Sequence, residues 1–92
     1  MLIRHNNIEF VNAQAMHSLH PGTFDVPTAG DLQALRVGNW VKVCVNNERF
    51  WCVVTDISEG IITGRVDNNL LQDGLQCGDV IQFPTDCIYD IM

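Results

Sequence analysis

The chain is poor in positive charge. Of its 92 residues only 5 are Lys or Arg while 11 are Asp or Glu, so the formal net charge at pH 7 is −6. The bases, which form no cluster along the chain, are Arg4, Arg36, Lys42, Arg49 and Arg65. A protein that binds nucleic acid needs a basic surface to displace counterions from phosphates. The shortage of bases therefore argues against a nucleic-acid partner and favours a basic protein as the partner.

Long apolar runs and targeting signals are also missing. The hydrophobic runs are a handful of residues long, far short of the roughly 20 that span a bilayer as a helix. The first residues, Met1 to His5, lack the apolar region and cleavage site of a signal peptide. We therefore expect no membrane partner, a cytoplasmic location, and one globular domain over residues 1–92.

Motifs for catalysis and for metal binding are absent from the sequence. There is no Cys-x-x-Cys, and His17 and His20 have no ligand pair at zinc-site spacing nearby. No nucleophile elbow, Gly-rich phosphate loop or His-Glu-x-x-His occurs. Asp67, Asp73 and Asp79 do not fit the spacing of a calcium loop, and we interpret them as turn residues. We therefore expect no metal, no cofactor and no catalytic residue.

The four cysteines are Cys44, Cys52, Cys77 and Cys87. A disulfide framework is expected only in a secreted chain, and no secretory signal is seen. The strand pattern described next also places Cys44 and Cys52 on opposite faces, which forbids a bridge between them. We predict four reduced cysteines, with Cys52 in the core.

What the sequence does contain is a strong β-hairpin pattern. Residues 40–45 and 50–55 are rich in Val and Trp, and the polar segment between them contains two Asn. Side chains alternate between the faces of a strand, and Lys42 should seek water, so the valine face is assigned to the core. The predicted core face consists of Val41, Val43, Val45, Phe50, Cys52 and Val54.

The register of this hairpin depends on the length of its loop. A four-residue loop pairs Val45 with Phe50, while a two-residue loop changes the partners but preserves the faces. The outer face then carries Trp40, Trp51 and Val53, which is much apolar surface to leave in water. It is either covered by another element or used for binding, and we expect the N-terminal helix to cover it.

That helix is predicted over about residues 6–19. Asn6 is a suitable N-cap, with Glu9 three residues later in a variant of the capping box. The apolar residues at helical spacing are Ile8, Val11, Ala15 and Leu19. Residues 20–39 are predicted to form a connector, in which Thr28 caps a short helical turn that continues to Leu35.

Two segments of the chain echo each other. Residues 35–41 and 75–81 share the pattern Leu, two residues, Gly, Asn or Asp, one residue, then a β-branched residue. Each copy predicts a tight turn that leads into a strand, with Gly38 and Gly78 at a positive φ. We expect Asn39 and Asp79 to bond the backbone that follows them.

Further strands are predicted at 61–66, 80–83 and 88–91, with Gly64 at a bend or bulge. Five short, bent strands separated by turns are typical of a small barrel. The predicted fold is therefore α+β, mainly β. It consists of a five-stranded SH3-like barrel over residues 40–92, preceded by the N-terminal helix and the connector.

Several segments resemble the YegJ-like family of uncharacterised bacterial proteins. They are residues 20–27, 35–38, 48–51, 64–68, 78–83 and 88–91, in the same order along the chain. The combination of segments is specific, although no single one is. Asn39 and Cys52 depart from the family pattern, which more often has Asp and an aliphatic residue there. The resemblance implies no reaction, because the family is of unknown function.

The candidate binding residues are Trp51, Arg65, Asp67, Asn68 and Asn69. Trp51 is a large amphipathic side chain of the kind that interfaces favour, whereas Asn68 and Asn69 either present amides to a partner or shape a turn. We expect a non-catalytic protein-binding module, such as an inhibitor or immunity-type partner of a basic protein. The alternative is a small-molecule-binding or enzymatic role in a pocket between helix and barrel, near residues 67–79. The sequence does not define the oligomeric state.

Overall fold

The computed structural model describes residues 2–92. Met1, which the predicted domain includes, lies outside the described residues. Within them the strands are β1 (Leu2–His5), β2 (Ile8–Val11), β3 (Trp40–Val45), β4 (Glu48–Ser58), β5 (Ile61–Val66), β6 (Val80–Pro84) and β7 (Asp90–Ile91). The helices are α1 (Ala13–Leu19), α2 (Ala29–Gln33) and the 3-10 turn η1 (Thr85–Cys87).

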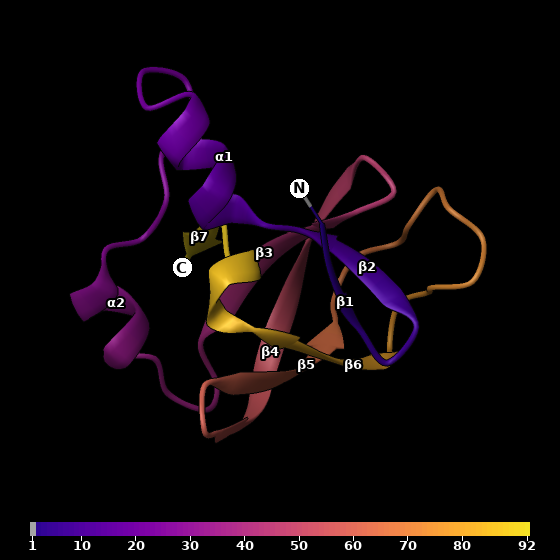
Figure 1. Cartoon of the computed structure of the whole chain (residues 1–92). Coiled ribbons are helices and arrows are strands. Elements are labelled where there is room, and N and C mark those ends of the chain that lie inside the picture. The colour runs from indigo at the N-terminus through magenta and orange to yellow at the C-terminus, as the bar shows by residue number, and fades with distance from the viewer. Residues whose placement is uncertain (1) are drawn as a thin grey trace.

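One antiparallel sheet contains all of these strands in the order β1-β2-β3-β4-β5-β6, with β7 paired to β3 (Figure 1). The bent sheet brings the N-terminal hairpin close to β6. The ring centroids of Phe10 and Phe83 are 5.3 Å apart, and Asn6 Nδ2 donates to Gln82 Oε1 at 3.0 Å. These links are between side chains, and among residues 2–92 no ladder joins β1 or β2 to β6.

The predicted five-stranded SH3-like barrel is therefore wrong. A barrel requires backbone hydrogen bonds between its first and last strands, so that no edge remains. Here the sheet has two additional strands at its N-terminal end and stays open at β1 and β6. The correct description is a mostly β domain built on an open, strongly bent antiparallel sheet.

The N-terminal segment differs from the prediction because its two asparagines form a turn. Asn6 and Asn7 have φ of 50° and 66°, the left-handed pair that a two-residue hairpin requires. Residues 2–11 are consequently a hairpin, and Phe10 on β2 is fully buried. The helix begins only at Ala13, where Asn12 is the N-cap and its side chain accepts from the Ala15 N–H at 3.0 Å.

The central hairpin confirms the predicted core face but not its favoured register. Val43 lies opposite Phe50 and Val41 opposite Cys52, so the loop contains two residues instead of four. Asn46 and Asn47 fill it with φ of 52° and 62°. All six residues of the predicted core face are buried, which is consistent with the preserved alternation.

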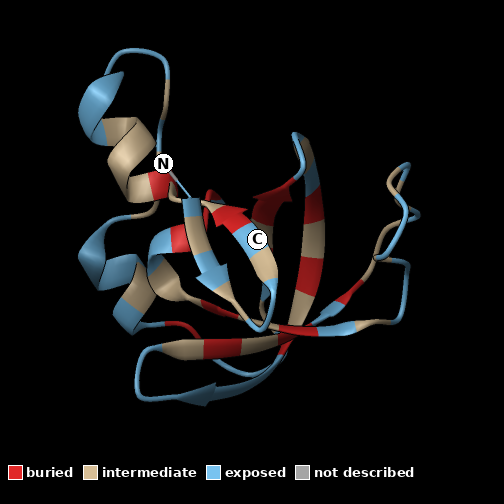
Figure 2. Ribbon diagram, turned by 45° about the vertical axis from the view of Figure 1, so that its right-hand side comes forward, coloured by how far each residue is buried: buried red, intermediate tan, exposed pale blue. Residues whose placement is uncertain are grey.

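The core lies on the inner face of the bent sheet, and buried and exposed residues alternate along the strands (Figure 2). Its largest fully buried side chains are Phe10, Phe50, Phe83, Ile62 and Ile88. Burial of each such side chain contributes roughly 1.5–3 kcal/mol relative to exposure. Gly64 faces this core next to the register shift of β4 between Val54 and Asp56, so the bulge is on the strand opposite the glycine.

The predicted helical turn after Thr28 is confirmed as α2. The Thr28 hydroxyl accepts from the Asp31 N–H at 3.1 Å, and the Asp31 carboxylate accepts from the Thr28 N–H at 3.1 Å. This reciprocal capping box satisfies two backbone donors that the first turn of a helix leaves unpaired. Leu32 of the same helix packs against the core.

Candidate binding surface

The outer face of the sheet carries a row of side chains that crosses four strands. Trp40 lies opposite Val53, Val53 opposite Arg65, and Arg65 opposite Val80. Directly paired residues of an antiparallel sheet share one face, and the core residues that alternate with these four are buried. Val80 is 65% exposed and Trp40 is 39% exposed. We call this row the outer-face strip.

A second row beside the strip contains the central tryptophan. Lys42 lies opposite Trp51, and its Nζ is 4.8 Å from the centroid of the Trp51 ring. A cation over an aromatic face at this distance is attracted by the ring quadrupole. Asp90 on β7 lies opposite Lys42 on its other side. Trp51 is thus half-buried, with the Lys42 ammonium over its ring.

The predicted site residues come together at the end of this row. The Trp51 carbonyl accepts from the Asp67 N–H at 3.0 Å, and the Trp51 N–H donates to Asn68 Oδ1 at 2.6 Å. Arg65 lies one row away on the strip. Asn68 therefore uses its side-chain oxygen to shape the turn after β5, while Asn69 is exposed at the start of the loop that follows.

The N-terminal helix packs over the opposite end of the outer face from the strip. Ala13 forms a buried cluster with Cys44 and Tyr89, and α1 lies beside η1. The Arg49 guanidinium extends this cover, at 4.8 Å from the Tyr89 ring centroid and 5.3 Å from that of Phe24.

The prediction that the helix covers Trp51 and Val53 is therefore wrong, since neither residue is in the cluster that joins the helix to the sheet. The N-cap of the helix is Asn12, six residues later than the predicted Asn6, and the hairpin that replaces the first predicted turns leads the helix to the Cys44 end of the face. The candidate residues chosen from the sequence also omit Val80 and Met92. Met92 is 70% exposed, and its backbone forms hydrogen bonds with that of Trp40. The alternation of Val80 with buried Ile81 and Phe83 was the available signal.

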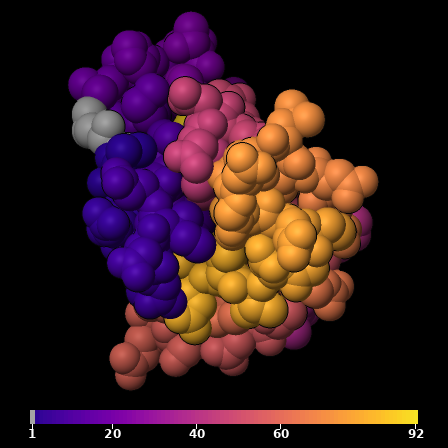
Figure 3. All heavy atoms as spheres, turned by 90° about the vertical axis from the view of Figure 1, so that its right-hand side faces the viewer, coloured from indigo at the N-terminus to yellow at the C-terminus, as the bar shows by residue number. Residues whose placement is uncertain are grey.

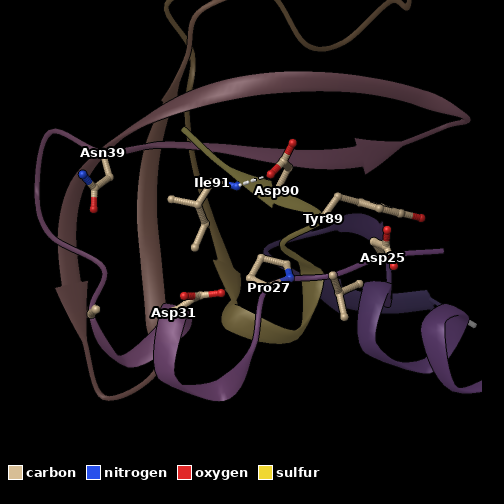
Figure 4. Close-up of a pocket in the computed structure, with 9 residues that line it drawn as sticks. Asp25, Pro27, Asp31, Asn39, Tyr89, Asp90 and Ile91 are labelled. Atoms are coloured by element: carbon tan, nitrogen blue, oxygen red, sulfur yellow. Dashed lines mark hydrogen bonds between the residues drawn. The ribbon is translucent and has the colours of Figure 1, made fainter. Parts of the chain in front are cut away.

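An acidic hollow of about 700 Å³ lies between the connector and the β7 edge of the sheet (Figure 4). Its carboxylates come from Asp25, Asp31 and Asp90, and Tyr89 forms part of its wall. Two of these carboxylates already accept backbone hydrogen bonds, Asp31 from Thr28 and Asp90 from Ile91 at 2.9 Å. Among residues 2–92 no group of three or more His, Cys, Asp or Glu side chains is placed to hold a metal ion.

A second hollow, of about 500 Å³, lies between the N-terminal hairpin and the loop of residues 67–79. Figure 3 shows the hairpin in indigo and the loop in orange on either side of the β3–β4 turn. Ile8, Val45 and Leu75 form part of its apolar wall. The hollow borders residues 67–79, where the alternative pocket was expected, but its other wall is the N-terminal hairpin and not the helix α1. Leu70 and Leu75 pack against the core, whereas Leu71 is 96% exposed.

The buried cysteines offer little nucleophilic chemistry. All four are free thiols, as predicted, and Cys44, Cys52 and Cys87 are buried. Burial raises the pKa of Cys52 to about 12, with a further contribution from the negative charge of Asp67. Burial likewise raises the pKa of Cys87 to about 12, helped by Asp86. At neutral pH both groups are thiols rather than thiolates, which are the reactive form.

Comparison of the chain with models of known protein families, with curated proteins and with solved structures finds no match. The resemblance to the YegJ-like family therefore stays a prediction. None of the helices in the described part of the chain is long and apolar enough to cross a membrane.

Proposed function

We propose that the chain is a non-catalytic protein-binding module that docks on a basic protein through the outer-face strip. The observation that carries this proposal is the outer-face strip itself, in which Trp40, Val53 and Val80 are apolar and Arg65 lies between the two valines, at the end of the sheet that α1 leaves uncovered. Large apolar side chains in contiguous exposed patches mark interaction surfaces. An inhibitor or immunity-type role fits the small size and the acidic charge.

The composition of the strip and its surroundings also supports docking. Interface centres are enriched in Trp and Arg, and both occur here, as Trp40, Trp51 and Arg65. The net charge of −6 favours encounter with a positively charged partner, since complementary fields raise association rates. Four free cysteines fit a reducing compartment, which supports a cytoplasmic location as part of this proposal. Membership of the YegJ-like family is proposed separately, from the sequence segments that resemble it.

The test uses site-specific photocrosslinking in the cells that naturally express the protein. A photoreactive residue at Val80 is expected to give a protein adduct, while the same residue at exposed Ser18 on α1 is the control position. The adduct partner is then purified, and binding is measured by calorimetry. Trp40→Ala and Val80→Ser should each weaken binding about tenfold or more, as central interface residues do. Leu19→Ser, at a 55% exposed apolar residue on α1, should leave the affinity unchanged.

Two results would contradict the proposal. The first is an adduct yield at Val80 no higher than at Ser18. The second is a purified pair whose affinity is insensitive to Trp40→Ala and Val80→Ser. Val80 is 65% exposed and Trp40 39% exposed, so the melting temperature of each variant is measured beside the parent chain, and that of Val80→Ser should stay close to it. Lost binding in a folded variant can then be assigned to the strip.

A small-molecule role is the second candidate, and the acidic hollow favours it. Its volume of about 700 Å³ falls within the range of ligand sites, and the charge of Asp25, Asp31 and Asp90 suits a cation. An aliphatic diamine is a suitable probe. A rise in melting temperature that Asp25→Asn with Asp90→Asn abolishes would support this function, and an unchanged melting temperature at millimolar diamine would reject it.

A further inference from the structure

The loop between β5 and β6 is held in one conformation by a carboxylate on β4. Glu48 Oε2 accepts from the Leu71 N–H at 2.8 Å, and its Oε1 accepts from the Gln72 N–H at 3.2 Å. The Gln72 side chain donates to the Val45 carbonyl at 3.0 Å, and its oxygen accepts from Asn46 Nδ2 at 3.0 Å. Glu48 and Gln72 thus connect the loop backbone around Leu71 to the β3–β4 turn.

The side chain at the centre of this network is left in solvent. Leu71 is 96% exposed, while its neighbours Leu70 and Leu75 pack against the core. Transfer of an exposed leucine side chain out of water is favourable, so a partner that covers Leu71 gains binding free energy. Because the backbone is already ordered, little conformational entropy is lost when the loop binds.

The loop itself carries charge of one sign. Residues 67–79 contain three acids, Asp67, Asp73 and Asp79, and no Lys or Arg. The Glu48 carboxylate, which accepts hydrogen bonds from the loop backbone, adds a further negative charge. A surface that meets this loop therefore needs positive charge around the place where the leucine enters, since like charges at an interface are strongly unfavourable.

We infer that the loop of residues 67–79 is a preorganised recognition loop that inserts Leu71 into an apolar socket rimmed by Lys or Arg on the partner protein. The inference rests on the proposed function, because it requires a protein partner, but it uses a surface other than the outer-face strip. It assigns Glu48 a positioning role, since that carboxylate touches the loop backbone and not the partner.

The experiment places a photoreactive residue at Leu71, at Val80 or at Ser18 in three separate full-length chains. An adduct from Leu71 that maps to apolar residues flanked by Lys or Arg is the expected result. In the purified pair, Leu71→Ser should weaken binding about tenfold or more, and Leu19→Ser should not change it. Glu48→Gln should also weaken binding although Leu71 is still present, because the side-chain amide cannot hold both loop N–H groups in the same way.

The outcomes separate this inference from the proposed function. An adduct at Val80 without one at Leu71 overturns the loop inference and leaves the docking proposal standing. An adduct at Leu71 that maps to a polar or acidic surface also overturns it. Adducts at neither position overturn both. An affinity unchanged in Leu71→Ser, whose exposed site keeps the variant folded, counts against the inference even when an adduct forms.

Discussion

Glu48 is the residue on which the order of the β5–β6 loop depends most. Hydrogen bonding from the Leu71 N–H lowers the pKa of this carboxyl below its ordinary value of 4.5, with further help from the side chain and backbone of Gln72 and against partial desolvation. A carboxyl with a depressed folded pKa stabilises the fold above its unfolded pKa, and that stabilisation is lost as the pH falls through the folded value.

This sign predicts that the loop loosens in acid. As the pH falls below about 4.5, protonation of Glu48 should release the amides of Leu71 and Gln72, because a neutral carboxyl accepts hydrogen bonds less strongly. Amide exchange or amide chemical shifts followed by NMR would report it. In Glu48→Gln the same amides should be loose at every pH, and a pH-dependent change at Leu71 in that variant would contradict the assignment.

The cysteines allow a second prediction at the scale of single residues. Cys77 is exposed, Cys52 and Cys87 have pKa values near 12, and burial raises the pKa of Cys44 against the opposing charge of Arg49. A thiol reagent at pH 8 should therefore label one cysteine rapidly in the native chain and four after denaturation. The Cys77→Ser variant should show no rapid phase. Two or more rapidly labelled thiols in the native chain would be incompatible with the buried positions.

At the scale of elements, the two echoed turns at Gly38 and Gly78 have nearly the same backbone geometry. Gly38 and Gly78 have φ of 95° and 96°, which confirms the predicted positive values. In each turn the Asn39 or Asp79 side chain accepts from the N–H three residues earlier, at 2.9 and 3.0 Å. The prediction that each side chain bonds the backbone that follows it is therefore wrong, because each bonds the backbone that precedes it. Each glycine N–H also donates to the neighbouring strand at 2.8 Å.

These turns give a matched prediction for three glycines. A Cβ at Gly38, Gly78 or Gly22 would meet no atom within 4 Å, but only the first two have positive φ. Alanine at Gly38 or Gly78 should therefore destabilise by about 1–2 kcal/mol through backbone strain alone. That corresponds to a fall of roughly 5–15 °C in melting temperature for a domain of this size. Alanine at Gly22 is the control, and an equal loss there would show that strain is not the cause.

Sequence patterns predicted faces better than they predicted boundaries. Strand alternation requires that Val41, Val43 and Cys52 share a face whatever the loop length, so the core face survived a wrong register. Asn6 and Asn7, by contrast, suit both a helix cap and a hairpin turn, and local sequence does not decide between them. The choice depends on whether residues 2–5 have a strand to pair with, which is a tertiary property.

The candidate site was predicted only in part, because strand alternation is local whereas the cover of a face depends on tertiary structure. Alternation identified the outer face of Trp40 and Trp51, and the register then placed Arg65 and Val80 in line with Trp40. Whether α1 covers that face depends on where the helix starts and how the hairpin directs it. Whether the sheet closes into a barrel likewise depends on whether its first and last strands pair, and the residue pattern within a strand does not determine this.

At the scale of the whole molecule, the N-terminal hairpin has the shortest backbone ladder to the rest of the sheet. The β2 strand is in register with β3 only at Phe10 and Val45, whereas β3, β4 and β5 are joined by long ladders. Its other contacts with the sheet include the Phe10–Phe83 pair and the Asn6–Gln82 hydrogen bond. A unit with few backbone links opens at a lower free energy than the rest of the fold.

We therefore expect the amides of β1 and β2 to exchange with solvent faster than those of β4 and β5. Native-state hydrogen exchange by NMR measures this directly. Phe10→Ala should accelerate exchange in the hairpin, and removal of such a buried ring costs about 3–5 kcal/mol in total. Equal protection across all strands would mean that the hairpin and the sheet unfold as one unit.

Both tryptophans of the chain, Trp40 and Trp51, lie on the outer face and neither is in the core. Their indole emission therefore depends on what touches that face. A partner that excludes water from the strip should shift the emission of the unlabelled chain to shorter wavelength. The Lys42 ammonium above Trp51 gives that ring a different surrounding from Trp40, so replacing Trp40 with Phe would leave a single emitter at the centre of the surface. The protein thus contains its own optical reporter for occupancy of the face that we propose it uses.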